Sequence, residues 1–163
     1  MKMYVIHTAA GKECAVCSEL IRSEMSAYVP IETALIRREG MWTKENRILF
    51  PGYVFLSAEI APDVYYHVKR TDGVIRFLGS PPTSLSVSEQ SRIEWLCNGG
   101  IKLEPSLITV SDTGEIKALN GILKGNEKLI RRYNRRQKKV VLDIPIGGKK
   151  HTVRLSVEEQ LSL

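Results

Sequence analysis

The sequence has little of what membrane-spanning or disulfide-stabilised proteins need. No apolar run approaches the roughly 18 residues of a transmembrane helix. The first residues lead into a strand-like segment without the apolar stretch of a signal peptide. The 3 cysteines are an odd number, which argues against a disulfide framework. We therefore expect a cytoplasmic protein that makes no use of a membrane.

The motifs of common enzymes are also missing. There is no phosphate-binding G-x-x-x-x-G-K-[ST] loop, no H-E-x-x-H and no G-x-S-x-G. The histidines are far apart in sequence, at His7, His67 and His151. Cys14 and Cys17 have C-x-x-C spacing, but on a predicted helix they simply face the same way, and Cys97 is the only other cysteine. We expect no catalysis, no metal and no cofactor.

What the chain does have is positive charge concentrated in one part. Its 163 residues suffice for one or two small domains, and its net charge is +6. Residues 1–111 carry 12 basic and 12 acidic residues, whereas residues 112–163 carry 12 basic and 6 acidic ones. Between Lys128 and Lys139 there are seven basic residues and no acid. A neutral part joined to a basic part predicts two modules, the second of which binds a polyanion.

The hydrophobic pattern of residues 1–98 predicts an α+β domain with an antiparallel sheet and flanking helices. Helices are expected over residues 13–24, 61–70 and 88–97. Strands are expected over residues 4–8, 27–31, 33–38, 41–50, 53–57 and 74–78. A turn around Glu39-Gly40 is expected to join 33–38 and 41–50 as a hairpin.

A linker is predicted over residues 99–113, which contain Gly99-Gly100 and Pro105. Residues 114–163 then have the period of strands, with alternation of apolar residues from Val140 to Ile146 and a turn signal at Gly147-Gly148. Several short strands in about 50 residues predict a small C-terminal β-barrel.

The stretch from Leu49 to Leu56 permits two interpretations. Pro51-Gly52 is a turn signal, and in the strand that follows Tyr53 and Phe55 share one face. The two aromatics either form a docking site for a partner or are buried in the core.

Several segments resemble the NusG family of transcription elongation factors. The family element is Phe50-Pro51-Gly52-Tyr53-Val54. Other parts of the family's N-terminal domain are matched in the same order along the chain. The matching segments are residues 4–8, residues 11–13, Tyr28-Val29-Pro30 and residues 65–79. The resemblance implies an NGN-like fold for residues 1–98.

Residues 114–163 resemble the family's KOW domain, with departures. Gly121-Ile122-Leu123-Lys124-Gly125 stands where the family has Gly-Pro-Phe-x-Gly, and Lys128 stands at the next expected glycine. Together with the high density of basic residues, these departures most resemble the specialised antiterminator subgroup LoaP.

The resemblance implies that the N-terminal domain binds the clamp helices of RNA polymerase and suppresses pausing and termination. The residues that would contact polymerase are Phe50, Tyr53, Phe55, Tyr65, Tyr66 and His67. Lys12 and Arg22 would reach the non-template DNA strand, or they are solvated charges on a helix face.

The basic domain is predicted to bind a structured RNA, a hairpin in the nascent leader transcript. The candidate residues are Lys128, Arg131, Arg132, Tyr133, Arg135, Arg136, Lys138, Lys139, Lys149, Lys150 and Arg154. If residues 129–134 and 137–144 pair as strands, their turn projects cations, with Tyr133 and His151 available for stacking. The alternatives are a stand-alone RNA-binding module, or a general elongation factor whose C-terminal domain binds protein partners such as the ribosome. We expect a monomer.

Overall fold

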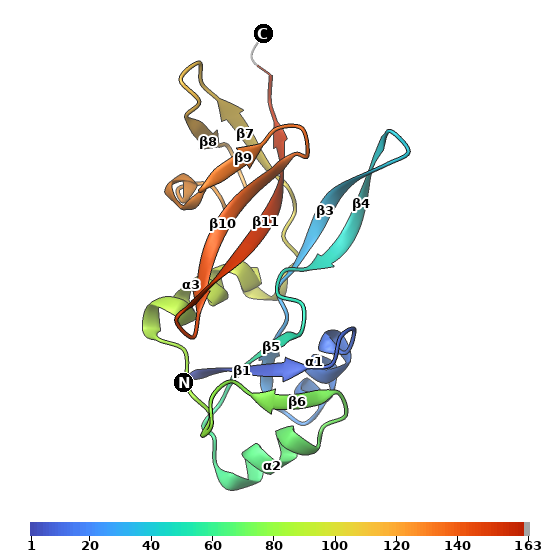
Figure 1. Cartoon of the computed structure of the whole chain (residues 1–163), viewed down its shortest axis with the longest axis vertical. Coiled ribbons are helices and arrows are strands. Elements are labelled where there is room, and N and C mark those ends of the chain that lie inside the picture. Colours follow the sequence, from blue (N-terminus) through green and yellow to red (C-terminus); the bar gives the residue numbers. More distant parts are fainter. Residues whose placement is uncertain (162–163) are drawn as a thin grey trace. The chain divides into compact units, whose positions relative to one another are not determined.

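The computed structural model describes residues 1–161, and these form two compact units (Figure 1). The first unit comprises Met1–Val29, Phe50–Ile93 and Ile146–Lys149. The second comprises Pro30–Leu49, Glu94–Pro145 and the described residues from Lys150 onward. Residues 162–163, at the end of the predicted C-terminal domain, lie outside the described residues.

The first unit is built on a four-stranded sheet with the order β2-β5-β1-β6. The strands are β1 (Met3–Thr8), β2 (Ser26–Tyr28), β5 (Tyr53–Ser57) and β6 (Val74–Phe77). Two helices, α1 (Glu13–Arg22) and α2 (Pro62–Arg70), bury Val16, Leu20 and Val68 in one core with Val54 and Leu56 of the sheet. A third helix, α3 (Val87–Cys97), begins in this unit. The α+β architecture predicted from the sequence is confirmed.

The Pro-Gly turn is held by the start of α1. Gly52 has a φ of +85°, a left-handed conformation that glycine adopts without strain. Its amide donates to the buried carboxylate of Glu13 at 2.7 Å, and its carbonyl accepts from the Thr8 amide at 2.8 Å. The turn and the motif at the start of α1, far apart in sequence, therefore form one local structure.

The second unit contains a five-stranded sheet with the order β8-β7-β11-β10-β9. The strands are β7 (Ser106–Val110), β8 (Ile116–Ala118), β9 (Arg132–Asn134), β10 (Lys139–Ile146) and β11 (Lys149–Glu159). Two short 3₁₀ segments lie at η1 (Asn98–Gly100) and η2 (Glu127–Leu129). Strand β7 pairs with β11 in parallel and with β8 antiparallel. The turn predicted at Gly147-Gly148 joins β10 to β11.

A hairpin from the first third of the sequence groups with this second unit. It consists of β3 (Ile31–Arg38) and β4 (Met41–Ile48), joined by Glu39 and Gly40 with positive φ angles of 51° and 78°. The Leu103 carbonyl accepts from the Thr33 amide at 2.7 Å, and the Leu103 amide donates to the Ile31 carbonyl at 2.9 Å. The hairpin was expected from its turn, but a turn signal does not specify which sheet a hairpin joins.

The contacts thus divide the chain differently from the linear order of domains expected from the sequence. Residues 99–113 were expected to be a linker, yet they contain β7, which lies inside the five-stranded sheet. Its Ile108 is fully buried, and burial of this kind is what holds a short strand in a sheet. Independent folding of residues 1–98 and 114–163 stays a prediction, as does a closed barrel of the KOW type.

Candidate functional site

The aromatic residues around the Pro-Gly turn are mostly buried. Tyr53 lies opposite His7 and Phe55 opposite Val5 in the sheet register, so these side chains share one face. Phe50 is 3% exposed and Phe55 0%, and their rings meet edge to face at 5.5 Å. Tyr53 is half-buried and packs edge to face on His7 at 4.8 Å. Of the three predicted contact residues, only Tyr53 therefore reaches the surface.

Helix α2 divides its three candidate residues between the core and the surface. The ring of Tyr65 stacks on Phe77, with centroids 5.5 Å apart and planes 13° apart. Tyr66 is 59% exposed. His67 is also exposed, and its Nε2 lies 3.0 Å from the Ser23 hydroxyl. A partner can therefore reach Tyr66 and His67, whereas Tyr65 belongs to the packing of the sheet.

The two candidate DNA contacts are both on the surface of the first unit. Lys12 is exposed directly before α1. Arg22 forms an ion pair with Glu19 at 2.8 Å, and their side chains are 75% and 49% exposed. Exposed pairs of this kind contribute little to stability, so the geometry is compatible with both interpretations of these charges.

The predicted basic turn is present between β9 and β10. Asn134 and Lys139 are partners in the antiparallel register. The Asn134 side-chain oxygen accepts from the Gln137 amide at 3.0 Å, and the Arg135 carbonyl accepts from the Lys138 amide at 3.2 Å. Lys138 has a φ of +55°, an uncommon conformation for a residue with a side chain. The strand pairing that the sequence predicted here is confirmed.

Several candidate RNA contacts already have acidic partners. The Arg135 guanidinium pairs with Glu159 at 2.8 Å, and the Tyr133 hydroxyl donates to the same carboxylate oxygen at 2.7 Å. Burial, together with Glu159, raises the pKa of Tyr133 to about 12. Arg131 lies 3.4 Å from Asp143. The Tyr133 ring is thus tied to Glu159 through its hydroxyl and lies 5.9 Å from the Arg135 guanidinium, and its use for stacking stays a prediction.

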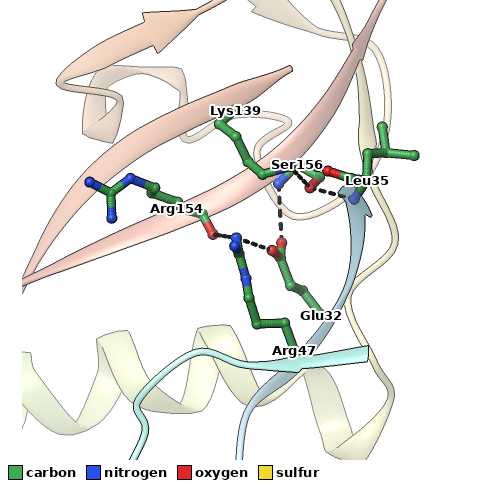
Figure 2. Close-up of polar contacts among 6 residues, drawn as sticks. All are labelled: Glu32, Leu35, Arg47, Lys139, Arg154 and Ser156. Carbon is green, nitrogen blue, oxygen red and sulfur yellow. Dashed lines mark hydrogen bonds and ion pairs between the residues drawn. The ribbon is translucent and has the colours of Figure 1, made fainter. Parts of the chain in front are cut away.

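Lys139 was predicted to contact RNA, but it is buried, at 7% exposed. Its ammonium donates to the Leu35 carbonyl and, at 2.9 Å, to the Ser156 hydroxyl, which in turn accepts from the Leu35 amide at 2.9 Å (Figure 2). Burial lowers the pKa of Lys139, and the positive charge of Arg47 acts in the same direction. Lys139 therefore holds β3 to the sheet and is not part of the exposed surface.

Glu32 completes this buried network. The carboxylate is 2% exposed, and it accepts from the Arg47 guanidinium at 2.7 Å and from the Ser156 amide at 3.1 Å. Burial raises the pKa of Glu32, while the bonds from Ser156 and Arg47 oppose that rise. Arg47 also donates to the Arg154 carbonyl at 3.3 Å. The network is a set of satisfied polar groups that joins β3 and β4 to β10 and β11 (Figure 2).

Lys138 is half-buried, whereas five further candidate cations of the second unit are exposed; they are Lys128, Arg132, Arg136, Lys150 and Arg154. Within residues 1–161, the guanidinium groups of Arg132 and Arg136 make neither a hydrogen bond nor an ion pair. Lys149 is also exposed, and it falls in the first unit. His151 is half-buried. Fewer of the candidates are therefore exposed than the sequence predicted, and of these five Arg136 lies in the β9–β10 turn and Arg132 in the adjoining strand.

The β3–β4 hairpin contributes residues to this region that were not predicted from the sequence. Arg37 and Trp42 are direct partners in its register, and the Lys138 ammonium lies 4.5 Å from the centroid of the Trp42 ring. A tryptophan within a few residues of Arg37-Arg38 was the available signal, since aromatics beside cations are typical of single-stranded nucleic-acid sites.

Neither a metal site nor a membrane segment is found in the part of the chain that the structure describes. No group of at least three His, Cys, Asp or Glu side chains is placed to hold a metal ion among residues 1–161. No helix within the same residues combines the length and the apolar content needed to cross a membrane.

Comparison with known proteins points to one family. A family model described as "Transcription termination factor nusG" matches residues 1–94. The chain is 25% identical to the transcription termination/antitermination protein NusG of Neisseria meningitidis serogroup B, over 97% of this chain and 96% of the relative. It is 33% identical to NusG of Halalkalibacterium halodurans over 47% of this chain and 48% of the relative. Among solved structures it is similar in fold to one that concerns domain interaction in Thermotoga maritima NusG. That similarity has a TM-score of 0.58, 20% identity, and coverage of 96% of this chain and 93% of the other.

Proposed function

The chain belongs to the NusG family, and we propose that its first unit binds RNA polymerase while its second unit binds a structured leader RNA. Members of this family are transcription termination/antitermination factors, not enzymes, and they act with RNA polymerase. The proposed outcome is suppression of pausing and termination, as in the antiterminator subgroup LoaP. The observation that carries the RNA-binding part is the positive charge gathered at the β9–β10 turn.

For polymerase we propose the clamp helices as the binding site. Tyr53, Tyr66 and His67 are the candidates whose side chains reach the surface. Phe50, Phe55 and Tyr65 would support that surface from below, because they are buried or packed against the core. Lys12 and Arg22 would lie within reach of the non-template DNA strand.

Replacing Tyr66 by alanine is expected to weaken polymerase binding by about tenfold, since an exposed aromatic at an interface often contributes more than 1 kcal/mol. A pull-down of polymerase by the full chain, quantified over a concentration series, measures the change. Ile21→Ala is the matched control, because Ile21 is a large apolar residue of α1 that is 54% exposed. Equal retention of polymerase by the wild type and a folded Tyr66→Ala variant would remove Tyr66 from the proposed surface.

For RNA we propose that Arg132 and Arg136 contact phosphates. Both are exposed, and among residues 1–161 neither has an ionic partner to give up on binding. Arg135 and Arg131 must first exchange Glu159 and Asp143 for phosphate. Phosphate contacts supply affinity but little selectivity, so the shape of the RNA or its exposed loop bases must supply the specificity.

The Arg132→Gln, Arg136→Gln double variant is expected to bind RNA more weakly and with a flatter salt dependence. The slope of log affinity against log salt should fall by about one unit for each phosphate that the variant no longer neutralises. The probe is a stem-loop RNA enriched by the wild-type chain from a pool with randomised loops, titrated by fluorescence anisotropy at two salt concentrations. Arg76→Gln, an exposed cation of β6, is the control. A double variant with wild-type affinity and slope would contradict the assignment of these arginines.

A further inference from the structure

A basic pocket of about 520 Å³ lies within the second unit, between the β3–β4 hairpin and the β9–β10 turn. Sites that take small ligands commonly have volumes of about 300–1,000 Å³. Its polar and aromatic lining consists of Arg37, Trp42 and Arg47 from the hairpin and Arg136, Gln137 and Lys139 from the turn and β10. It is therefore large enough for a nucleotide, and two separate elements form its walls.

The charge of the pocket favours an anion. Four of its lining residues are cations, and none is acidic. The Arg47 guanidinium and the Lys139 ammonium are engaged in the buried network. Arg37 and Arg136 are exposed, and within the described residues their guanidinium groups make no hydrogen bond or ion pair. Two guanidiniums without partners at one opening are suited to phosphate, whose oxygens they can bind in pairs.

Trp42 adds an aromatic surface to this charge. Its side chain is half-buried, and the ammonium of Lys138 lies 4.5 Å from the ring centroid, in cation–π contact. Lys138 takes a left-handed backbone conformation next to the pocket, and such uncommon conformations often occur at functional sites. Nucleic-acid bases stack on aromatic side chains of this kind, and the neighbouring cations then meet the phosphates.

The buried network holds the two walls in place before any ligand arrives. Leu35 of the hairpin, itself a lining residue, accepts a hydrogen bond from Lys139 and donates one to Ser156, both through its backbone (Figure 2). Lys139 and Ser156 are 7% and 3% exposed. Binding to walls that are already positioned loses less entropy than binding to mobile ones.

We propose that this pocket receives one unstacked nucleotide from an RNA loop. The base stacks on Trp42 in place of the Lys138 ammonium, and the flanking phosphates contact Arg37 and Arg136. This inference rests on the proposed RNA-binding function and deepens it, because it makes the β3–β4 hairpin part of the RNA-binding surface. It also supplies a way to recognise a loop, since a paired base cannot enter the pocket.

Trp42→Leu tests the stacking directly. The probes are a stem-loop RNA and a fully paired duplex of the same length, titrated against the full chain. We expect the variant to bind the stem-loop about tenfold more weakly and the duplex with unchanged affinity. Met41→Ala is the matched control, because Met41 is a neighbouring apolar residue of the hairpin that is 71% exposed.

Tryptophan fluorescence gives an independent readout. The sequence has two tryptophans, so Trp95→Phe leaves Trp42 as the sole emitter. Circular dichroism checks the fold of that variant, since Trp95 donates to the Ile122 carbonyl at 3.2 Å. Saturating stem-loop RNA should quench the Trp42 emission, and the duplex should not.

The outcomes separate this inference from the proposed function. If the stem-loop binds but does not quench the Trp42 emission, or if Trp42→Leu binds it with wild-type affinity, the pocket assignment is overturned. Either result leaves the RNA-binding function standing. Equal affinity of the wild type for stem-loop and duplex contradicts that function, and quenching by a single-stranded oligonucleotide would then still support the pocket. If adenosine monophosphate quenches the Trp42 emission with the same affinity as the stem-loop, the pocket is assigned to free nucleotides. That result overturns its role in RNA recognition.

Discussion

Replacing Phe55 by alanine is expected to lower the free energy of unfolding by about 3–5 kcal/mol, since large aromatic-to-alanine changes in a core have effects of this size. Phe55 is fully buried, and its ring packs edge to face against Phe50 at 5.5 Å. Alanine would leave a cavity between β5 and the residues that cover this face. Urea unfolding followed by circular dichroism measures the loss.

Tyr53→Ala is the matched comparison, because Tyr53 lies on the same strand face but is half-buried. Its effect on stability should be clearly smaller than that of Phe55→Ala. The comparison matters for function, because Phe55 supports the surface from below and does not itself touch polymerase. Loss of polymerase binding by Phe55→Ala would therefore report a weakened fold. Equal and small effects of the two substitutions would show that the Phe55 side chain is not packed as described.

Replacing Glu32 by alanine is expected to destabilise the second unit by about 2–3 kcal/mol, because the buried carboxylate that satisfies a buried amide and balances nearby positive charge is removed. The substitution would leave the Ser156 amide without its acceptor and Arg47 and Lys139 without their counter-charge. Hydrogen exchange of the amides in β3 and β4 should rise, since the network joins these strands to β10 and β11. Urea unfolding gives the size of the effect.

Glu45→Ala is the control for this second prediction. Glu45 lies in the same hairpin and also pairs with an arginine, Arg38, at 2.8 Å, but this pair is more exposed, since the Glu45 side chain is 39% exposed and that of Glu32 only 3%. Its removal should leave the stability nearly unchanged, because exposed ion pairs contribute little. If Glu32→Ala and Glu45→Ala behaved alike, the buried network would not be what holds the hairpin in the second unit.

Local signals in the sequence were sufficient for the elements and for most turns. The positive φ angles at Glu39-Gly40 and Gly52 and the turn between β9 and β10 all fall where the residue types predicted them. Helix α1 follows the spacing of Val16 and Leu20, which both face the core. These features depend on residues that are close together in the chain, so they can be predicted from a single sequence.

Features set by distant residues could not be predicted in the same way. The run from Lys128 to Lys139 is uniformly basic in sequence, yet Lys139 is buried because Leu35 and Ser156 supply its acceptors. Phe55 was correctly placed on a strand face, but its neighbours in the sequence left open whether this face would be buried in the core or exposed as a docking site. The pocket at Trp42 needs the hairpin and the β9–β10 turn together, and their separation of about ninety residues hides that pairing.

The central claim is that the second unit of this NusG-family chain recognises a structured RNA. The most direct measurement is a titration of the full wild-type chain against the enriched stem-loop and against a scrambled RNA of the same composition, at two salt concentrations. We expect the stem-loop to bind more tightly at both concentrations, with a similar salt slope for the two RNAs, because the phosphate contacts are shared and the loop contacts are not. Equal affinity for both RNAs at both salt concentrations would contradict the claim and leave only a non-specific basic surface.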